Sequence, residues 1–315
     1  MKKTYIILSL FAILLFCSSN TKAQTRTAAT EAEYGNIVVF LETASWGQRD
    51  PYNTLCFTTS GAKAATGCVP LAYAIICQYH QWPERAKEVK AYHSGTGEYI
   101  MLGHEYDYEK MLDNYRGEYT DEESMAAATL IRDIGYAYQV AYGTGSTGSG
   151  SAGEGAHKLI DIFKYKSESP NIQSATYATV RDVLNNDELW IQYIKESLDA
   201  GCPIPYSSST IGGGRHIFIL DGYTDKDYFH FNWGWNGQGN GWFKLDDMKP
   251  DAYSDYSSSH KAYFMLKPDK GETGIEFIEQ EPGIYNGIYD LTGRRIEEIT
   301  EPGIYIIDGK KIIKR

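Results

Sequence analysis

The 315-residue chain is poor in basic residues relative to acidic ones, and this imbalance excludes several classes of partner. Lys and Arg number 30 against 41 Asp and Glu, so the formal net charge is -11. Binding to duplex DNA or to an anionic membrane needs a concentrated basic face. We therefore expect no nucleic-acid partner, and an acidic surface that serves chiefly to keep the protein in solution.

Long apolar runs are also scarce. The one candidate, YIILSLFAILLF near the N-terminus, is shorter than the ~20 residues that a membrane span requires. Lys2 and Lys3 precede it and the small residue Ala23 follows, the order typical of a secretory signal peptide. We interpret residues 1–23 as that signal, and predict an exported protein without a membrane span. In a rival interpretation Cys17 is a lipid-attachment site, but the residues before it are bulky where such sites prefer small ones.

Cysteine is rare. If Cys17 leaves with the signal, Cys56, Cys68, Cys77 and Cys202 remain, with irregular spacing. No pair has C-x-x-C spacing and no histidine lies near one at metal-ligand distance, so neither a disulfide framework nor a bound metal is expected. Cys77 lies within an apolar run, where a thiol behaves as a small core residue.

Cys68 lies where a helix should begin. Thr66 and Gly67 are typical of a loop, Pro70 is tolerated in a first helical turn, and the apolar pattern ends at Trp82-Pro83. Unpaired N–H groups and the positive end of the helix dipole lower the pKa of a thiol at that position. Cys68 is therefore a candidate nucleophile. The alternative is a cysteine at a helix start that simply packs under a loop.

A nucleophilic thiol needs a base, and of the seven histidines His216 has the most informative context. The stretch around it reads GGGRHIFILDGYTDKDYFHFNWGWNGQGNGWFKL, two alternating segments joined by the turn TDKD. This pattern predicts a β-hairpin that brings His216 close to Asn232 and Trp233. In the other interpretation, His216 is a strand-end residue whose nitrogens are satisfied by the backbone.

Helices are predicted mainly in the first half of the chain and strands in the second, which indicates an α+β fold. Thr120 and Glu123 form a capping box before MAAATLIRDIGYAYQVAY, and a further helix is predicted at Asp187–Ala200. The loop at 143–148 matches G-x-G-x-x-G, but it follows a helix where a dinucleotide motif must follow a strand. We expect it to form a flexible wall of a cleft, and we expect no cofactor.

Several blocks together resemble the streptopain family of secreted bacterial cysteine endopeptidases, whose fold is papain-like. The blocks are AATGCVPLAYAIICQYHQWP, GGGRHIFILDGY and YFHFNWGWNGQGNGWFKL, supported by WGQRDPYNTLC and YGTGSTGSGSAGEGAHKLIDIFKY. The resemblance spans residues 45–268 and implies a two-lobed papain-like peptidase domain, α+β in class, over residues 24–270. Agreement of several blocks is a stronger signal than any single motif.

The resemblance also implies roles for individual residues. Cys68 corresponds to the nucleophile and His216 to its base, as a thiolate–imidazolium pair, while the side-chain amide of Gln48 would stabilise the oxyanion. Trp233 and Trp235 would cover and orient the imidazole, with Asn232 as its amide partner. Ser151 would line the substrate cleft, and Trp235 would also contribute to substrate binding. The residue before the histidine, here Arg215, would contact substrate through its main chain.

Two features depart from the family pattern. Arg215 stands where the family usually has Gly, so its long cationic side chain either narrows the cleft or favours acidic or polar substrate positions. Residues 24–47 are too few for the long inhibitory propeptide that is typical of the family. Either the enzyme is made without that restraint, or a separate proteinaceous inhibitor or late folding controls it.

The last 45 residues, 271–315, form a separate segment. Two related pieces, EPGIYNGIYDLTGRR and EPGIYIIDGKKIIKR, begin at Glu281 and Glu301 and predict a small strand unit. This tail resembles the sorting domain of the type IX secretion route, which would place the protein outside the cell or on its surface. The alternative is a terminal hairpin packed on the main domain.

The sequence therefore predicts an exported cysteine endopeptidase that hydrolyses proteins or peptides through a thioester acyl-enzyme. Two alternatives remain open. The same Cys–His pair could serve an acyl-transfer enzyme, a transamidase or deamidase, and Arg215 with the short N-terminal segment is compatible with a catalytically silent relative that binds peptides.

Overall fold

The computed structural model describes residues 28–167, 179–210 and 213–271, together with four short strand segments beyond residue 287. The chain divides into two units, Met1–Asp269 and Lys270–Arg315. The predicted signal peptide and the predicted cleavage point lie outside the described residues.

The helices predicted at Cys68, after Thr120 and at Asp187–Ala200 are all present. The helix at Cys68 ends at His80, followed by Gln81 in a left-handed conformation, and the Thr120–Glu123 capping box is present at the start of the next long helix. That helix ends at Ala137, earlier than the predicted apolar pattern, because the chain turns there to form the loop at 143–148. The bounds are α1 Glu31–Tyr34, α2 Cys68–His80, η1 Tyr108–Lys110, α3 Asp121–Ala137, α4 His157–Asp161, α5 Arg181–Leu184 and α6 Asp187–Asp199.

A seven-stranded antiparallel sheet forms the centre of the first unit. Its order is β5-β10-β6-β7-β8-β9, and β1 pairs with β7 in addition. These strands are β1 Ile37–Phe40, β5 Thr179–Val180, β6 Ile204–Ser209, β7 Arg215–Thr224, β8 Phe229–Asn232, β9 Gly241–Phe243 and β10 Ser258–Ala262. Two smaller antiparallel pairs join β2 Lys90–Tyr92 to β3 Tyr99–Met101, and β4 Tyr165–Ser167 to β11 Leu266–Pro268.

The predicted hairpin around His216 is confirmed as β7 and β8. Ile219 lies opposite Asn232 and Tyr223 opposite Phe229, with the TDKD turn between the strands. The sequence pattern predicted a half-buried strand, but β7 is buried at every residue after Arg215. The reason is that both faces of the sheet are covered.

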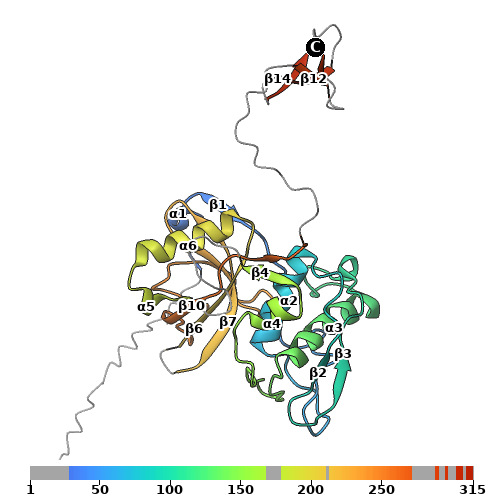
Figure 1. Cartoon of the computed structure of the whole chain (residues 1–315). Coiled ribbons are helices and arrows are strands. Elements are labelled where there is room, and N and C mark those ends of the chain that lie inside the picture. The colour runs from blue at the N-terminus through green and yellow to red at the C-terminus, as the bar shows by residue number, and fades with distance from the viewer. Residues whose placement is uncertain are drawn as a thin grey trace, which may run out of the picture. The chain divides into compact units, whose positions relative to one another are not determined.

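Two hydrophobic cores lie on the two faces of β7. Ile217 and Ile219 pack into the core built around α2 and α3, whereas Phe218 and Leu220 pack into an aromatic core that includes residues of α6, β8 and β9. Figure 1 shows the sheet with α6 on one side and α2 on the other. Alternate side chains of one strand thus serve both lobes, and the end of β7 lies where the lobes meet.

The second unit contains four short antiparallel strands in the order β13-β12-β14-β15. They are β12 Ile288–Asp290, β13 Arg295–Ile296, β14 Gly303–Ile307 and β15 Lys310–Lys314. These strands agree with the predicted strand-rich tail. Its sorting role stays a prediction.

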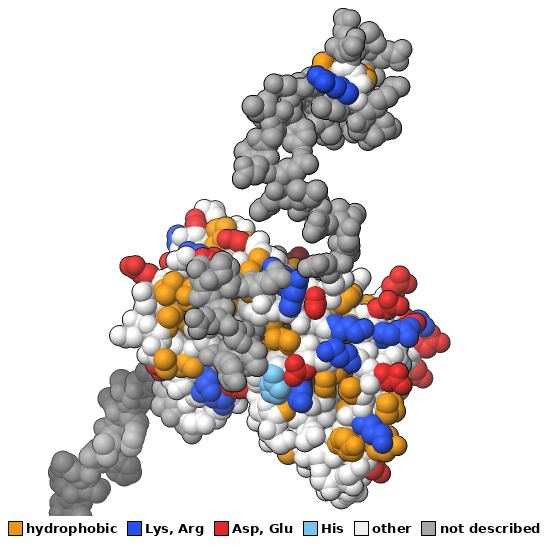
Figure 2. Space-filling model, in the orientation of Figure 1, with side chains coloured by type: hydrophobic (Ala, Val, Ile, Leu, Met, Phe, Trp, Pro, Cys, Tyr) orange, Lys and Arg blue, Asp and Glu red, His pale blue; other side chains and the backbone are white. Residues whose placement is uncertain are grey.

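The described surface mixes charges of both signs. On the face drawn in Figure 2, Lys and Arg side chains lie among Asp and Glu side chains rather than in one basic patch. Among the described residues, no helix combines the length and apolar composition needed to cross a membrane.

Candidate active site

Cys68 is the first residue of α2, at the position that the loop-to-helix pattern predicts. Gly67 before it has φ 87°, a conformation that favours glycine, and a Cβ there would lie 2.9 Å from Thr147 Cγ2. Thr147 in turn donates a hydrogen bond of 2.6 Å to the carbonyl of Ala65. The sharp turn at Gly67 thus presents the Cys68 thiol at the helix start, supported by the loop at 143–148.

Hydrogen bonds fix the loop at 143–148 in place. The guanidinium of Arg49 donates to the carbonyls of Thr144 and Gly145 at 2.7 and 2.6 Å, and Ala65 N–H donates to Gly143 at 3.0 Å. The predicted flexible wall is therefore held by backbone hydrogen bonds to the segment that carries Cys68.

The Cys68 thiol faces the start of β7. The backbone N–H of Ile217 interacts with the sulfur, and Ile217 directly follows His216. Two segments almost 150 residues apart in the chain, the start of α2 and the start of β7, therefore meet at this point.

The imidazole of His216 is oriented by the backbone. Its Nε2 lies 2.8 Å from the carbonyl oxygen of Trp233, and a carbonyl can only accept a hydrogen bond. Nε2 therefore carries the proton, which leaves Nδ1 of the neutral ring with a free lone pair. This is the tautomer that a general base requires.

Aromatic rings enclose the imidazole, which is 7 % exposed. Trp235 stacks on it, with ring centroids 5.2 Å apart and an interplanar angle of 18°. The Trp233 ring lies in the aromatic core and is fully buried, so Trp235 covers the imidazole while Trp233 orients it through its main chain.

Burial shifts the pKa values of both groups toward their neutral forms. Desolvation raises the pKa of the Cys68 thiol, outweighing the N–H groups of Ile217, Cys68 and Val69, which lower it. Desolvation also lowers the pKa of His216 to about 4. The sequence predicted a lowered thiol pKa and a thiolate–imidazolium pair. The predicted lowering of the thiol pKa is corrected here, because removal from water disfavours the thiolate more than the helix start favours it. The thiolate–imidazolium pair stays a prediction.

Asn232 is not the partner of the imidazole, which corrects the predicted amide contact. Its Nδ2 donates to the carbonyl of Ala44 at 2.8 Å and to Thr43 Oγ1 at 3.0 Å. Its Oδ1 accepts from Gly234 N–H at 3.3 Å and from Asn240 Nδ2 at 3.2 Å. These contacts use both ends of the amide, so Asn232 acts by holding the turn that carries Trp233.

Gln48 belongs to the segment beside Cys68. Its carbonyl accepts a hydrogen bond of 3.2 Å from Thr66 N–H, two residues before the thiol. Its half-buried side chain has no hydrogen-bond partner among the residues that the structure describes. The amide is thus an available donor, as the predicted oxyanion role requires.

Ser151 is exposed, and its hydroxyl donates to Gln139 Oε1 at 2.8 Å. The hydroxyl can still accept a hydrogen bond, and a contact of Ser151 with substrate stays a prediction. Arg215 opens β7 next to His216, and its guanidinium is partly exposed.

Two residues near the thiol were missed by the sequence interpretation. The Tyr256 ring lies 5.9 Å from that of His216 and 5.3 Å from that of Trp233, and burial, with the charges of Asp251 and Cys68, raises its pKa. Glu154 contributes a negative charge that raises the pKa of Cys68. No local pattern marks either residue, because each reaches the site only through tertiary contacts.

The other described cysteines differ from Cys68. Cys56, Cys77 and Cys202 are buried and free, and burial raises the pKa of each thiol, to about 11 for Cys56. The core position predicted for Cys77 is confirmed.

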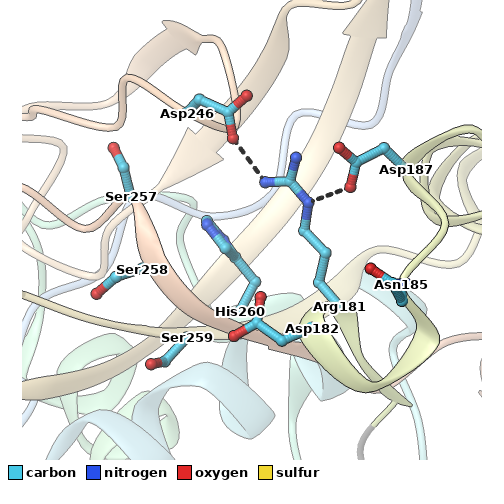
Figure 3. A pocket seen from close by; sticks show the side chains of 9 residues that line it. All are labelled: Arg181, Asp182, Asn185, Asp187, Asp246, Ser257, Ser258, Ser259 and His260. Carbon is cyan, nitrogen blue, oxygen red and sulfur yellow. Dashed lines mark hydrogen bonds and ion pairs between the residues drawn. The ribbon is translucent and has the colours of Figure 1, made fainter.

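A separate polar pocket of about 520 Å³ lies away from these residues. Figure 3 shows Arg181 at its centre, paired with Asp187 and Asp246 at 2.8 Å each. It contains no cysteine, and neither Cys68 nor His216 lines it. The described residues include no group of three or more His, Cys, Asp or Glu side chains arranged to hold a metal ion.

The sequence profile of the peptidase C10 family matches residues 46–243, which include Cys68, His216 and Gln48. The chain belongs to the peptidase C10 family. It is 30 % identical over 239 residues to thiol protease/hemagglutinin PrtT of Porphyromonas gingivalis, covering 72 % of this chain and 26 % of that protein. It is 29 % identical over 227 residues to streptopain of Streptococcus pyogenes, covering 66 % of this chain and 54 % of streptopain. The chain thus spans about half the length of streptopain and about a quarter of PrtT.

Solved structures agree with the family. The active interpain A cysteine protease of Prevotella intermedia superposes with a TM-score of 0.61 at 27 % identity, covering 77 % of this chain and 98 % of that one. A prointerpain A fragment from the same organism gives a TM-score of 0.55 at 27 % identity, covering 76 % and 74 % of the two chains. The predicted papain-like α+β fold is confirmed, as is the predicted family.

Proposed function

We propose that this member of the peptidase C10 family is a cysteine endopeptidase, with Cys68 as nucleophile and His216 as general base. One observation carries the proposal. The Cys68 thiol meets the backbone N–H of Ile217, while the neighbouring His216 ring donates its Nε2 proton to Trp233 and keeps Nδ1 free. Relatives named as thiol or cysteine proteases support the same chemistry.

The first chemical step is attack on the scissile carbonyl. Because burial favours a neutral thiol and a neutral imidazole, Nδ1 of His216 takes the thiol proton as sulfur bonds to the carbonyl carbon. The imidazolium then protonates the leaving amine, and a thioester joins the acyl group to Cys68. Water, deprotonated by the same imidazole, hydrolyses the thioester and restores the thiol.

Charge that develops on the carbonyl oxygen needs a donor in place before the reaction. The side-chain amide of Gln48, together with the Cys68 backbone N–H at the start of α2, would supply it. Such donors are already oriented, so they stabilise the transition state more than the bound substrate. In this proposal Asn232 and Trp235 position the imidazole, and Trp233 holds its proton through the main-chain carbonyl.

Unfolded casein tests the proposal. The mature protein should release new peptide termini, and pretreatment with a thiol alkylator, Cys68→Ala or His216→Gln should abolish this release. His157→Gln is the matched control, because His157 lies on α4 and should leave cleavage unchanged. Release of ammonia or amine cross-linking without new termini would instead indicate a transamidase or deamidase. Peptide binding without any product would indicate a silent relative.

We further infer that the protein is exported, with residues 1–23 as a signal and residues 271–315 as a sorting tail. Support comes from the order of basic and apolar residues at the N-terminus and from the four short strands of the second unit. Expression of the full chain and of a chain ending at residue 270 in a host with type IX secretion tests this. The full chain should reach the medium or the cell surface, and the shortened one should stay in the periplasm.

A further inference from the structure

Four side chains form a cluster of charges next to the candidate nucleophile. They are Glu154, Ser207, Arg215 and Lys261, here called the charged cluster. Ser207 Oγ donates to Glu154 Oε2 at 2.9 Å, and Arg215 Nη1 donates to Ser207 Oγ at 3.0 Å. Glu154 Oε1 lies 3.8 Å from Arg215 Nη1 and 3.6 Å from Lys261 Nζ.

The strand register explains why the cations gather there. Lys261 of β10 lies opposite Ser207 of β6, and Ser209 of β6 lies opposite Arg215 of β7. Residues that lie opposite one another, or two apart on one strand, point to the same face of a sheet. Arg215, Ser207 and Lys261 therefore share the face that α2 covers.

The cluster adjoins Cys68 from two directions. The carbonyl of Glu154 accepts a hydrogen bond of 2.6 Å from the Tyr73 hydroxyl, and Tyr73 lies on α2 five residues after Cys68. The carboxylate is close enough to raise the pKa of the Cys68 thiol, and Arg215 directly precedes His216. We therefore expect a peptide bound across Cys68 to pass near this cluster.

The cluster carries one carboxylate and two cations, an excess of one positive charge. The Arg215 guanidinium uses only Nη1 for its hydrogen bonds within the described residues. Nη1 donates to Ser207 Oγ and, at 3.3 Å, to the carbonyl of Ser259. Nε and Nη2 have no hydrogen-bond partner among the described residues, and the side chain is 31 % exposed. A guanidinium offers these two donors side by side, in the geometry that binds a carboxylate with two parallel hydrogen bonds.

We propose that the charged cluster is a subsite that recognises an acidic side chain of the substrate, Asp or Glu, through the free edge of Arg215. Arg215 precedes Ile217, whose N–H faces the Cys68 sulfur, by two strand residues, and an extended peptide advances about 3.3–3.6 Å per residue. We therefore place the acidic residue within two positions of the scissile bond. Glu154 and Ser207 fix the other edge of the guanidinium, which pre-orients the free edge for the ligand. This inference rests on the proposed peptidase function.

Matched fluorogenic peptides test the subsite. Each carries Glu, Gln or Lys at one of the two positions on either side of the scissile bond, in an otherwise neutral sequence. At one position, kcat/KM for Glu should exceed that for Gln by about ten-fold, the lower end of the effect of a hydrogen bond to a charged group. The ratio should fall when the salt concentration rises from 50 to 500 mM, because Arg215 is partly exposed.

Two variants move the Glu-to-Gln ratio in opposite directions. Arg215→Gln should reduce it to about one, whereas Glu154→Gln, which leaves both cations without their carboxylate, should increase it. A purely structural role of the cluster would not move the ratio upward in any variant. Arg85→Gln is the control, because Arg85 is exposed and pairs with exposed Glu105 away from the cluster.

Failure of the subsite and failure of the peptidase function give different results. If neutral peptides are cleaved but Glu gives no advantage, or Arg215→Gln leaves the ratio unchanged, the subsite is wrong and the peptidase function stands. If no peptide is cleaved, the binding of the same peptides to the Cys68→Ala variant, measured by fluorescence anisotropy, tests the subsite instead. Tighter binding of the Glu peptide, lost when Arg215→Gln is added, supports the subsite, and equal binding of Glu and Gln peptides overturns it.

Discussion

His216 Nε2 lies 2.8 Å from the carbonyl oxygen of Trp233, and this contact sets the tautomer of the candidate catalytic base. The Trp233 peptide is held on both sides, since its N–H donates to Asn240 Oδ1 at 3.0 Å. A backbone carbonyl cannot titrate, so the orientation of the ring does not depend on the ionisation of its partner.

The pH dependence of activity follows from the burial of His216. Its pKa of about 4 means that the imidazole stays neutral, and able to accept the thiol proton, until the pH falls to about that value. We expect kcat/KM to be nearly flat from pH 5 to 7 and to fall below about pH 4.5. Steady-state kinetics on one peptide checks this, and a midpoint near pH 6.5 would contradict it.

The same shift predicts a loss of stability in acid. The folded pKa of about 4 lies below the ordinary value of 6.5, so the unfolded chain binds more protons between these two pH values. The contribution of His216 to the free energy of unfolding should therefore be fully present above pH 6.5 and decrease as the pH falls toward 4. Urea denaturation at several pH values, compared between the parent and His216→Gln, measures it; parallel curves would refute this assignment.

Gln48→Ala should lower kcat by roughly 100-fold and change KM little, because an oxyanion donor acts chiefly in the transition state. The melting temperature should stay close to that of the parent, since the side chain has no partner among the described residues. Gln48→Glu, of the same size but without the donor, should be as slow. Equal losses in kcat and stability would indicate a structural role instead.

Asn232→Ala should destabilise the protein by roughly 2 to 4 kcal/mol, because it leaves several buried groups without hydrogen bonds. Activity should also fall, since the turn that carries Trp233 loses its support. The exposed Asn36, which pairs with Asp225, provides a control, and Asn36→Ala should cost at most about 1 kcal/mol. Urea denaturation measures the free energy of unfolding of both variants. A difference between them of less than about 1 kcal/mol would count against the role given to Asn232.

Gly67→Ala should destabilise the protein through backbone strain and through a steric clash of the new Cβ. Gly61→Ala should destabilise it through backbone strain alone. Both glycines have positive φ, 87° and 79°, but only at Gly67 would a Cβ meet Thr147, at 2.9 Å. The strain costs about 1 kcal/mol at each position, so we expect a larger loss for Gly67→Ala. The rate of Cys68 alkylation should change in Gly67→Ala only; equal rates in both variants would show that the turn does not position the thiol.

Trp235→Ala should lower kcat about ten-fold while KM stays similar, because the imidazole loses its stacked cover and its fixed position. Trp235→Phe retains a stacking ring and should recover most of the activity. Tyr253→Ala, at a side chain that is 99 % exposed, should change nothing. A loss confined to KM would assign Trp235 to substrate binding alone and not to the imidazole.

Local patterns were sufficient to predict the long helices and the hairpin that carries His216. The proline in the first turn and the glycine before Cys68 predicted α2, the Thr120 capping box predicted α3, and strict alternation around TDKD predicted the β7–β8 hairpin. These signals are local because capping, turn formation and side-chain alternation depend on residues a few positions apart. Family membership also followed from the sequence, since several blocks agree in order and spacing.

The tertiary structure decided which groups meet and in which ionisation state. Asn232 and Trp233 are neighbours in the chain, yet only the Trp233 carbonyl reaches His216, and Glu154 and Tyr256 approach Cys68 without any local sign. The helix start alone predicts an acidic thiol, but burial by both lobes reverses the shift. Desolvation depends on all the atoms that surround a group, most of them distant in the chain, so only the folded protein determines it.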